Sequence, residues 1–134
     1  MKPSALIDTG AILALLDRDD EWHERSVETF RSLRLPLATS AAVLAELFHL
    51  LERHEHGAAW RLLRSGAVVV LAVGDEDLPD IEALMQKYRY RPMDFADAAL
   101  VSMTEMHGID TVFTLDNKDF RIYRPKHTKA FTLL

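Results

Sequence analysis

Residues 67–71 read Ala-Val-Val-Val-Leu, an uninterrupted apolar run that limits the possible folds more than any other stretch of the chain. β-branched residues favour strands. A continuous apolar run is typical of a strand buried on both faces, as in a parallel sheet that helices cover. We therefore expect an α/β protein with helices on both faces of its sheet.

Four more short apolar segments, at 5–7, 35–39, 109–115 and 130–134, are predicted to be strands. Helices are expected at 11–16, from 19 to about 33, from 41 to about 53, from 57 to about 66, at 78–88 and at 95–107, and Asp119-Phe120 is expected to begin a turn. Five strands separated mostly by helices predict a largely parallel sheet. A length of 134 residues with 49% hydrophobic content fits a single domain over residues 1–134.

The absence of cysteine excludes disulfides, thiolate zinc sites and cysteine nucleophiles, and it is compatible with a reducing cytosol. Asp8 interrupts the apolar N-terminal run, no small-residue cleavage site follows it, and no stretch is long enough to span a membrane. The expected location is therefore cytoplasmic, without a membrane partner.

The net charge of −5 argues against non-specific coating of nucleic acid, but residues 117–134 carry five bases against Asp119 alone. Residues 88–92 alternate aromatic and arginine side chains, which can stack on unpaired bases and hold phosphates. Such a segment can equally just cover an edge of the core. The candidate RNA-binding residues are Arg89, Tyr90, Arg91, Lys118 and Arg121.

Four carboxylates stand where ligands bind in open α/β sheets. Asp8 follows the predicted strand 5–7 and Asp116 ends the predicted strand 109–115, so both lie at carboxyl ends of strands. Asp97 lies in the helix that leads into the second of these strands, and Glu46 lies beside the apolar stripe of the helix from residue 41. Asp8, Asp97 and Glu46 each have a purely structural alternative. Asp8 can cap a helix, Asp94 and Asp97 have capping-box spacing, and Glu46 can reach water or an arginine.

If the strands at 5–7 and 109–115 are neighbours, Asp8, Asp97 and Asp116 share one edge of the sheet, and Glu46 joins them if its helix leans over the same crevice. Clustered carboxylates repel one another and could not all stay ionised unaided. A divalent cation resolves that conflict. Hard oxygen ligands favour Mg²⁺ or Mn²⁺ over zinc, and an ion held in this way usually acts on phosphates.

The chain resembles the PIN domain family, and in particular its VapC-type ribonuclease toxins. The resemblance spans nearly the whole chain and rests on four motifs, Leu-Ile-Asp8-Thr-Gly, Val-Leu-Ala-Glu46, Asp-Phe-Ala-Asp97-Ala-Ala-Leu-Val and Thr-Leu-Asp116-Asn-Lys-Asp-Phe. It implies an α/β/α sandwich with strand order 3-2-1-4-5 and Mg²⁺- or Mn²⁺-dependent cleavage of single-stranded RNA. It also implies a small antitoxin partner.

By the same resemblance, the catalytic and metal-binding residues are Asp8, Glu46, Asp97 and Asp116. Thr114 matches a hydroxyl residue that family members often carry, and Asp94, Asp119 and Thr9 are supporting candidates. The expected reaction is metal-assisted hydrolysis of a phosphodiester bond with one or two ions, leaving a 5′ phosphate and a 3′ hydroxyl. The substrate would be tRNA, rRNA or mRNA.

Other functions stay open on the sequence. A PIN-type nuclease of RNA maturation would share the site, and in a non-catalytic binding module the acids would only cap helices. A receiver-like phosphoacceptor domain is disfavoured because Ala72-Val73-Gly74, without an aspartate, follows the middle strand. Leucine-rich helices with Trp22 and Phe48 suggest more apolar surface than a small sheet can cover, and hence a homodimer.

Overall fold

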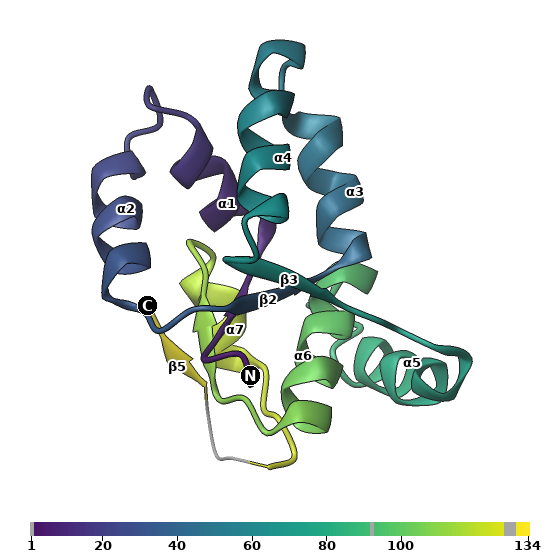
Figure 1. The fold of residues 1–134 in the computed structure, drawn as a ribbon. Coiled ribbons are helices and arrows are strands. Elements are labelled where there is room, and N and C mark those ends of the chain that lie inside the picture. The colour runs from purple at the N-terminus through teal and green to yellow at the C-terminus, as the bar shows by residue number, and fades with distance from the viewer. Residues whose placement is uncertain (1, 92, 128–130) are drawn as a thin grey trace.

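The computed structural model describes residues 2–91, 93–127 and 131–134. Its single sheet has five parallel strands in the order β3-β2-β1-β4-β5 (Figure 1). The strands are β1 (Leu6–Ile7), β2 (Leu37–Ser40), β3 (Val68–Leu71), β4 (Thr111–Phe113) and β5 (Thr132–Leu133). This architecture confirms the predicted three-layer α/β/α fold with strand order 3-2-1-4-5.

Helices flank the sheet as right-handed crossover connections require. They are α1 (Thr9–Leu16), α2 (His23–Ser32), α3 (Ala41–Leu50), α4 (His56–Arg64), α5 (Leu78–Lys87), α6 (Phe95–His107) and α7 (Asn117–Ile122), with 3₁₀ turns η1 (Arg53–Glu55) and η2 (Asp75–Asp77). In Figure 1, α1 to α4 lie above the sheet, α5 and α6 lie below it, and α7 lies beside β4 and β5.

The core is centred on β1, whose two residues Leu6 and Ile7 are completely buried between β2 and β4. Helix α6 buries seven consecutive residues, from 98 to 104, because alanine and serine let its backbone approach the sheet closely. Gly108 ends this helix in the left-handed conformation, with φ of 63°. The core thus holds the start of α1 and the body of α6 against the same end of the sheet.

The expectation that strand 67–71 is buried on both faces is wrong. β3 is an edge strand, and the side chain of Val70 is 46% exposed. Helix α4 contacts β3, and within the part of the chain that the structure describes no further strand pairs with its outer side. The apolar run therefore provides a partly exposed apolar edge rather than the middle of the sheet.

Several predicted boundaries also differ. The helix from residue 41 ends at Leu50, and α2 begins at His23 because Asp17 and Asp20 accept backbone N–H bonds in the preceding turns. Asp119-Phe120 was expected to begin a turn, but these residues lie inside α7. Of the predicted strand 130–134, Ala130 lies outside the described residues and β5 covers only Thr132–Leu133.

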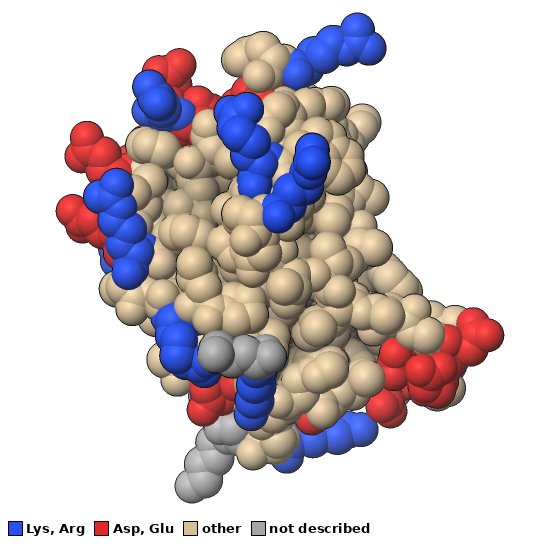
Figure 2. Space-filling model, viewed as in Figure 1, with Lys and Arg blue, Asp and Glu red and all other residues tan. Residues whose placement is uncertain are grey.

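None of the helices in the described part of the chain is long and apolar enough to cross a membrane. On the face shown in Figure 2, lysine and arginine side chains are spread over the upper middle, the left side and the lower edge, and acidic side chains gather at the lower right and upper left. This face thus has no continuous basic patch, which agrees with the overall negative charge.

Candidate active site

The carboxyl ends of β1 and β4 meet at one edge of the sheet. Ile7 pairs with Phe113 in the parallel register, and the Asp8 backbone N–H donates to the Phe113 carbonyl at 3.3 Å. A cavity of about 490 Å³ opens there. Its lining includes the four predicted catalytic carboxylates and three of the four supporting residues, namely Asp8, Glu46, Asp97, Asp116, Thr9, Asp94 and Asp119. We call this cavity the acidic pocket.

Asp8 caps a helix and also lines the acidic pocket, so the capping role and the place in the site that its sequence position suggested are compatible. Its Oδ1 accepts the Ala11 backbone N–H at 3.2 Å, which caps α1, and its Oδ2 accepts a hydrogen bond from the Thr114 hydroxyl. Burial raises the pKa of Asp8 from 3.8 to about 6, although the hydrogen bond from Thr114 acts in the opposite direction. A cation would remove this cost of burying a charge.

Thr114 connects the two strand ends from beneath the pocket. Its side chain is fully buried, and its Oγ1 donates to Asp8 while it accepts the Asp116 backbone N–H at 2.9 Å. Asp116 is exposed and caps α7 by accepting the Asp119 backbone N–H at 3.5 Å. Partial burial and the nearby carboxylate of Asp119 raise the pKa of Asp116. Thr114 therefore fixes the relative position of two pocket carboxylates.

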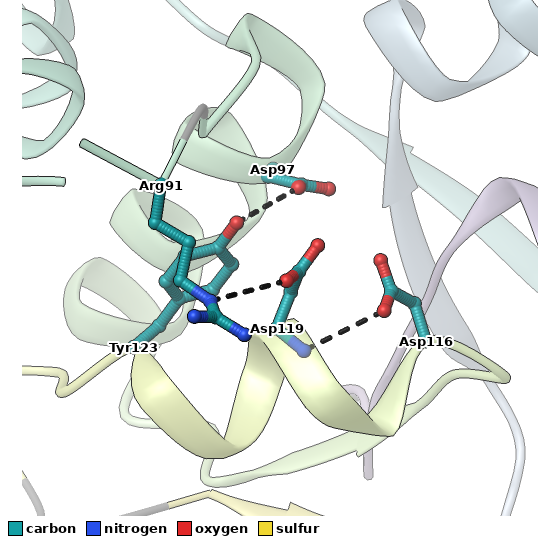
Figure 3. A network of polar contacts seen from close by, with 5 residues as sticks. All are labelled: Arg91, Asp97, Asp116, Asp119 and Tyr123. Carbon is teal, nitrogen blue, oxygen red and sulfur yellow. Dashed lines mark hydrogen bonds and ion pairs between the residues drawn. The ribbon is translucent and has the colours of Figure 1, made fainter. Parts of the chain in front are cut away.

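Asp97 has the capping position predicted from its spacing, but its carboxylate has another partner. Its backbone N–H donates to Asp94 Oδ1 at 2.8 Å, and its Oδ2 accepts a hydrogen bond from the Tyr123 hydroxyl at 3.1 Å (Figure 3). Burial, and next the carboxylate of Asp94, raise the pKa of Asp97 from 3.8 to about 7. The side chain of Asp97 is thus oriented by Tyr123 within a carboxylate-rich environment.

Tyr123 is the site residue that sequence reasoning missed. Its ring is completely buried and packs edge-to-face on Phe120 and Tyr88, at centroid distances of 5.3 and 5.1 Å. Burial, and next the carboxylate of Asp97, raise the pKa of Tyr123, so that its hydroxyl remains a donor. The available signal was the helical i, i+3 spacing of Phe120 and Tyr123, which the predicted turn at 119–120 concealed.

The structure separates the predicted RNA-binding residues into different places. Arg91 turns toward the acidic pocket, and its Nε lies 3.6 Å from Asp119 Oδ1 (Figure 3). Arg89 stacks over the ring of Tyr90 at 4.5 Å and lines an apolar cavity beside α5 instead. Lys118 and Arg121 are exposed on α7. Only Arg91 of this set forms an ion pair with a residue of the acidic pocket among the contacts described.

Glu46 lies on α3, and its side chain is exposed where it lines the acidic pocket with Val43. The apolar stripe beside Glu46 buries Val43 and Leu47, but Leu50 at its end is 54% exposed. Helix α3 contacts α6, which brings Glu46 to the same cavity as Asp97. Thr9, at the first position of α1, is buried in the pocket wall.

The donors in the acidic pocket suit a hard divalent cation, because they are carboxylate oxygens and the chain has no cysteine. Asp8 and Asp97 have raised pKa values there, which a bound cation would lower. Over residues 2–91, 93–127 and 131–134, no three histidine, aspartate or glutamate side chains lie close enough together to hold a metal ion. The carboxylates line one cavity while Thr114 and Tyr123 each orient one of them.

Comparisons with known proteins agree with this architecture. The family model of the PIN domain matches residues 5–125. Ribonuclease VapC26 of Mycobacterium tuberculosis is 28% identical, over 96% of this chain and 98% of that protein. The structure of VapC20 from the same species, described as a sarcin–ricin loop cleaving toxin, superposes with a TM-score of 0.76 at 24% identity, over 87% of this chain and 94% of that chain.

A toxin–antitoxin complex from Klebsiella pneumoniae has a chain with a TM-score of 0.68 at 19% identity, over 87% of this chain and 90% of that chain. At these identities the solved structures establish the shared fold. The family match covers most of the chain, including β1 and α7 at either end of the acidic pocket. The chain therefore belongs to the PIN domain family.

Proposed function

We propose that the protein is a metal-dependent endoribonuclease that hydrolyses single-stranded RNA with Mg²⁺ or Mn²⁺. The observation that carries the proposal is the acidic pocket, where carboxylates from separate parts of the chain, Asp8, Glu46, Asp97 and Asp116, line one cavity. A curated relative named as a ribonuclease supports the choice of RNA over other phosphodiesters.

In the proposed reaction, Asp8, Asp97 and Asp116 hold one cation, and Asp8 with Glu46 holds a second if two are bound. A bound Mg²⁺ or Mn²⁺ supplies the charge that activates water and stabilises the leaving oxygen. Thr114 fixes the position of Asp8 relative to Asp116, because it bonds to both residues. Tyr123 bonds to Oδ2 of Asp97, which leaves Oδ1 available for a cation.

Cations near the pocket would bind the RNA backbone. Arg91, which is half-exposed and paired with Asp119, can exchange this carboxylate for a phosphate oxygen. Lys118 and Arg121 on α7 are exposed for more distant phosphates, and Arg89 with Tyr90 offers a surface for stacking an unpaired base.

Cleavage is expected to require a divalent cation. Short labelled single-stranded RNAs, tRNA and rRNA should be cut with Mg²⁺ or Mn²⁺, and excess EDTA should reduce the initial rate by at least about 100-fold. The products should carry a 5′ phosphate and a 3′ hydroxyl, which end-specific enzymes can identify. Unchanged cleavage in EDTA would contradict the metal-dependent mechanism, and metal binding without any cleavage would favour a non-catalytic binding module.

Removing the Tyr123 hydroxyl is expected to weaken metal binding. Tyr123→Phe frees Asp97 from its orienting bond, and the loss of such a partner typically costs about 10- to 100-fold in metal affinity or activity. Tyr88→Phe is the matched control, because the Tyr88 hydroxyl accepts the Arg124 backbone N–H at 2.7 Å and forms no described bond to a carboxylate. Titration with Mn²⁺ measures both affinities, and equal values for the two variants would contradict a positioning role for Tyr123.

We also propose that the protein is the toxin of a toxin–antitoxin pair and works in the cytoplasm, where its RNA substrates are. The solved complexes with a similar fold support an antitoxin partner. A short open reading frame beside the gene, whose product binds this chain and blocks cleavage, would distinguish a toxin from a nuclease of RNA maturation.

A homodimer is the proposed assembly. Val70, Leu78 and Phe95 are 46%, 46% and 43% exposed, and they line an apolar groove from the end of β3 to the start of α6. A cavity of about 930 Å³ along α5 continues this groove and shares Leu78 and Phe95 with it. Exposed apolar surface of this kind favours association with a second copy.

A further inference from the structure

A second cavity lies next to the acidic pocket, between α2 and the end of β4. Its volume is about 120 Å³, and Leu115 lines both it and the acidic pocket. Thr114, whose hydroxyl holds Asp8, also lines this second cavity. The two cavities are therefore neighbours across the last residues of β4, and a group bound in one lies beside a group bound in the other.

The α2 side of this cavity presents an aromatic ring and a cation. The indole of Trp22 is 43% exposed, and the guanidinium carbon of Arg25 lies 5.8 Å from the centre of its ring. Trp22, Arg25, Ser26 and Thr29 all line the cavity and follow the i, i+3, i+4, i+7 spacing of one helix face. Aromatic rings and arginine side chains together are the groups on which proteins stack unpaired bases.

Ser26 supplies an independent observation. The residue is only 1% exposed, and its hydroxyl has no hydrogen-bond partner among the described residues. Buried hydroxyl groups normally have a partner, and an unmet one destabilises the fold. A polar group of a ligand in the cavity would satisfy this hydroxyl, so its place beside Trp22 and Arg25 indicates a binding site for a planar, hydrogen-bonding group.

The size of the cavity indicates what it can hold. Its volume of about 120 Å³ is about a quarter of the 490 Å³ of the acidic pocket. That is the scale of one aromatic ring system rather than a whole nucleotide. An aromatic side chain of a protein partner has a similar size, but the unmet hydroxyl and the adjoining acidic pocket favour a polar ring attached to a phosphodiester chain.

We propose that this cavity binds one nucleobase of the RNA, from a nucleotide beside the bond that is cleaved. The base stacks on Trp22, Ser26 hydrogen-bonds to a polar atom at its edge, and Arg25 contacts the base or its phosphate. The position relative to the cleaved bond rests on the proposed ribonuclease function, whereas binding of the base can be measured without cleavage.

The test uses short single-stranded RNAs, each with fluorescent 2-aminopurine at one position, and the full chain in EDTA to prevent cleavage. At one position the fluorescence should be quenched on binding. Trp22→Ala should abolish this quenching and weaken binding by about 5- to 100-fold, the usual effect of removing one stacking partner. Trp60→Ala is the matched control, because Trp60 is 52% exposed on α4 and does not line this cavity.

Ser26→Ala provides a second variant that keeps the fold, because it removes a hydroxyl without a described partner. It should unfold at an equal or higher urea concentration than the wild type, yet bind the quenched RNA several-fold more weakly. Equal affinity of Trp22→Ala, Ser26→Ala and Trp60→Ala would overturn the proposal. So would a Trp22→Ala variant that binds RNA normally and loses only a protein partner.

The outcome also separates this proposal from the proposed enzymatic function. Wild-type protein that quenches 2-aminopurine but does not cut RNA with Mn²⁺ would support the base-binding cavity and contradict the ribonuclease. Wild-type protein that cuts RNA, with an unchanged KM in Trp22→Ala and no quenching at any position, would support the ribonuclease and contradict the base-binding cavity.

Discussion

Replacing Asp8 with asparagine is expected to reduce RNA cleavage by more than about 100-fold while it stabilises the metal-free protein at neutral pH. The loss in rate should exceed the 10- to 100-fold effect typical of residues that only orient a metal ligand. The gain in stability follows from the pKa of Asp8, which burial raises from 3.8 to about 6. At 1.36 kcal/mol per pK unit, keeping this group charged at neutral pH costs about 3 kcal/mol.

Asparagine removes this cost but also replaces one acceptor oxygen by an amide nitrogen, so one of the bonds from Ala11 and Thr114 is weakened. The expected net increase in the free energy of unfolding is about 1–2 kcal/mol. Urea unfolding at pH 8 in EDTA measures it, and initial cleavage rates with Mn²⁺ measure the loss of activity. Asp19→Asn is the control, because Asp19 is an exposed acid outside the pocket. Wild-type activity or reduced stability of Asp8→Asn would contradict the assignment.

The second large effect is a dependence of stability on pH that runs opposite to ordinary acid denaturation. Asp8 has a pKa of about 6 in the folded protein and 3.8 as its ordinary value, so the folded state binds more protons between these values. Its stabilising contribution is fully present below about pH 4 and is lost as the pH rises through about 6. Asp97, with a pKa of about 7, extends the effect in the same direction.

The free energy of unfolding in EDTA, taken as the wild-type value minus that of Asp8→Asn, should therefore fall by about 3 kcal/mol between about pH 4 and pH 8. The subtraction removes the other acidic groups, which titrate in both proteins. Saturating Mn²⁺ should restore the wild-type stability at high pH, because the ion binds the charged carboxylates. A difference that is constant with pH would mean that folding does not raise the pKa of Asp8.

The proximity of Asp8 and Asp116 was predictable, because a carboxylate that directly follows a buried parallel strand lies at the carboxyl end of the sheet. Asp8 and Asp116 follow adjacent parallel strands, so their proximity depends only on strand order. The edge position of β3 was implied by the strand order of the family that the chain resembles, but it could not be predicted from the apolar run at 67–71 itself, because an edge strand that carries exposed apolar surface has the same sequence pattern as a buried one. Val70 shows this, since it is valine in sequence and 46% exposed in the structure.

Glu46 and Tyr123 show what depends on tertiary structure. Glu46 lines the acidic pocket only because α3 packs on α6, and its side chain is exposed there. Tyr123 lies 26 residues after Asp97, and their contact depends on how the end of α7 is placed relative to the first turn of α6. No local pattern contains that information, because the partner of a buried hydroxyl is selected by packing.

The two sides of the acidic pocket belong to parts of the fold that differ in local stability. Asp8 follows two fully buried residues at the centre of the sheet and its backbone N–H donates to Phe113, so we expect this N–H to exchange with solvent only when the sheet itself opens. Asp119 belongs to the six-residue helix α7 and Asp116 caps it, and we expect this short helix near the C-terminus to open at a lower free energy. One half of the site therefore shares the global stability of the molecule, while the other half can come apart and re-form as a local unit.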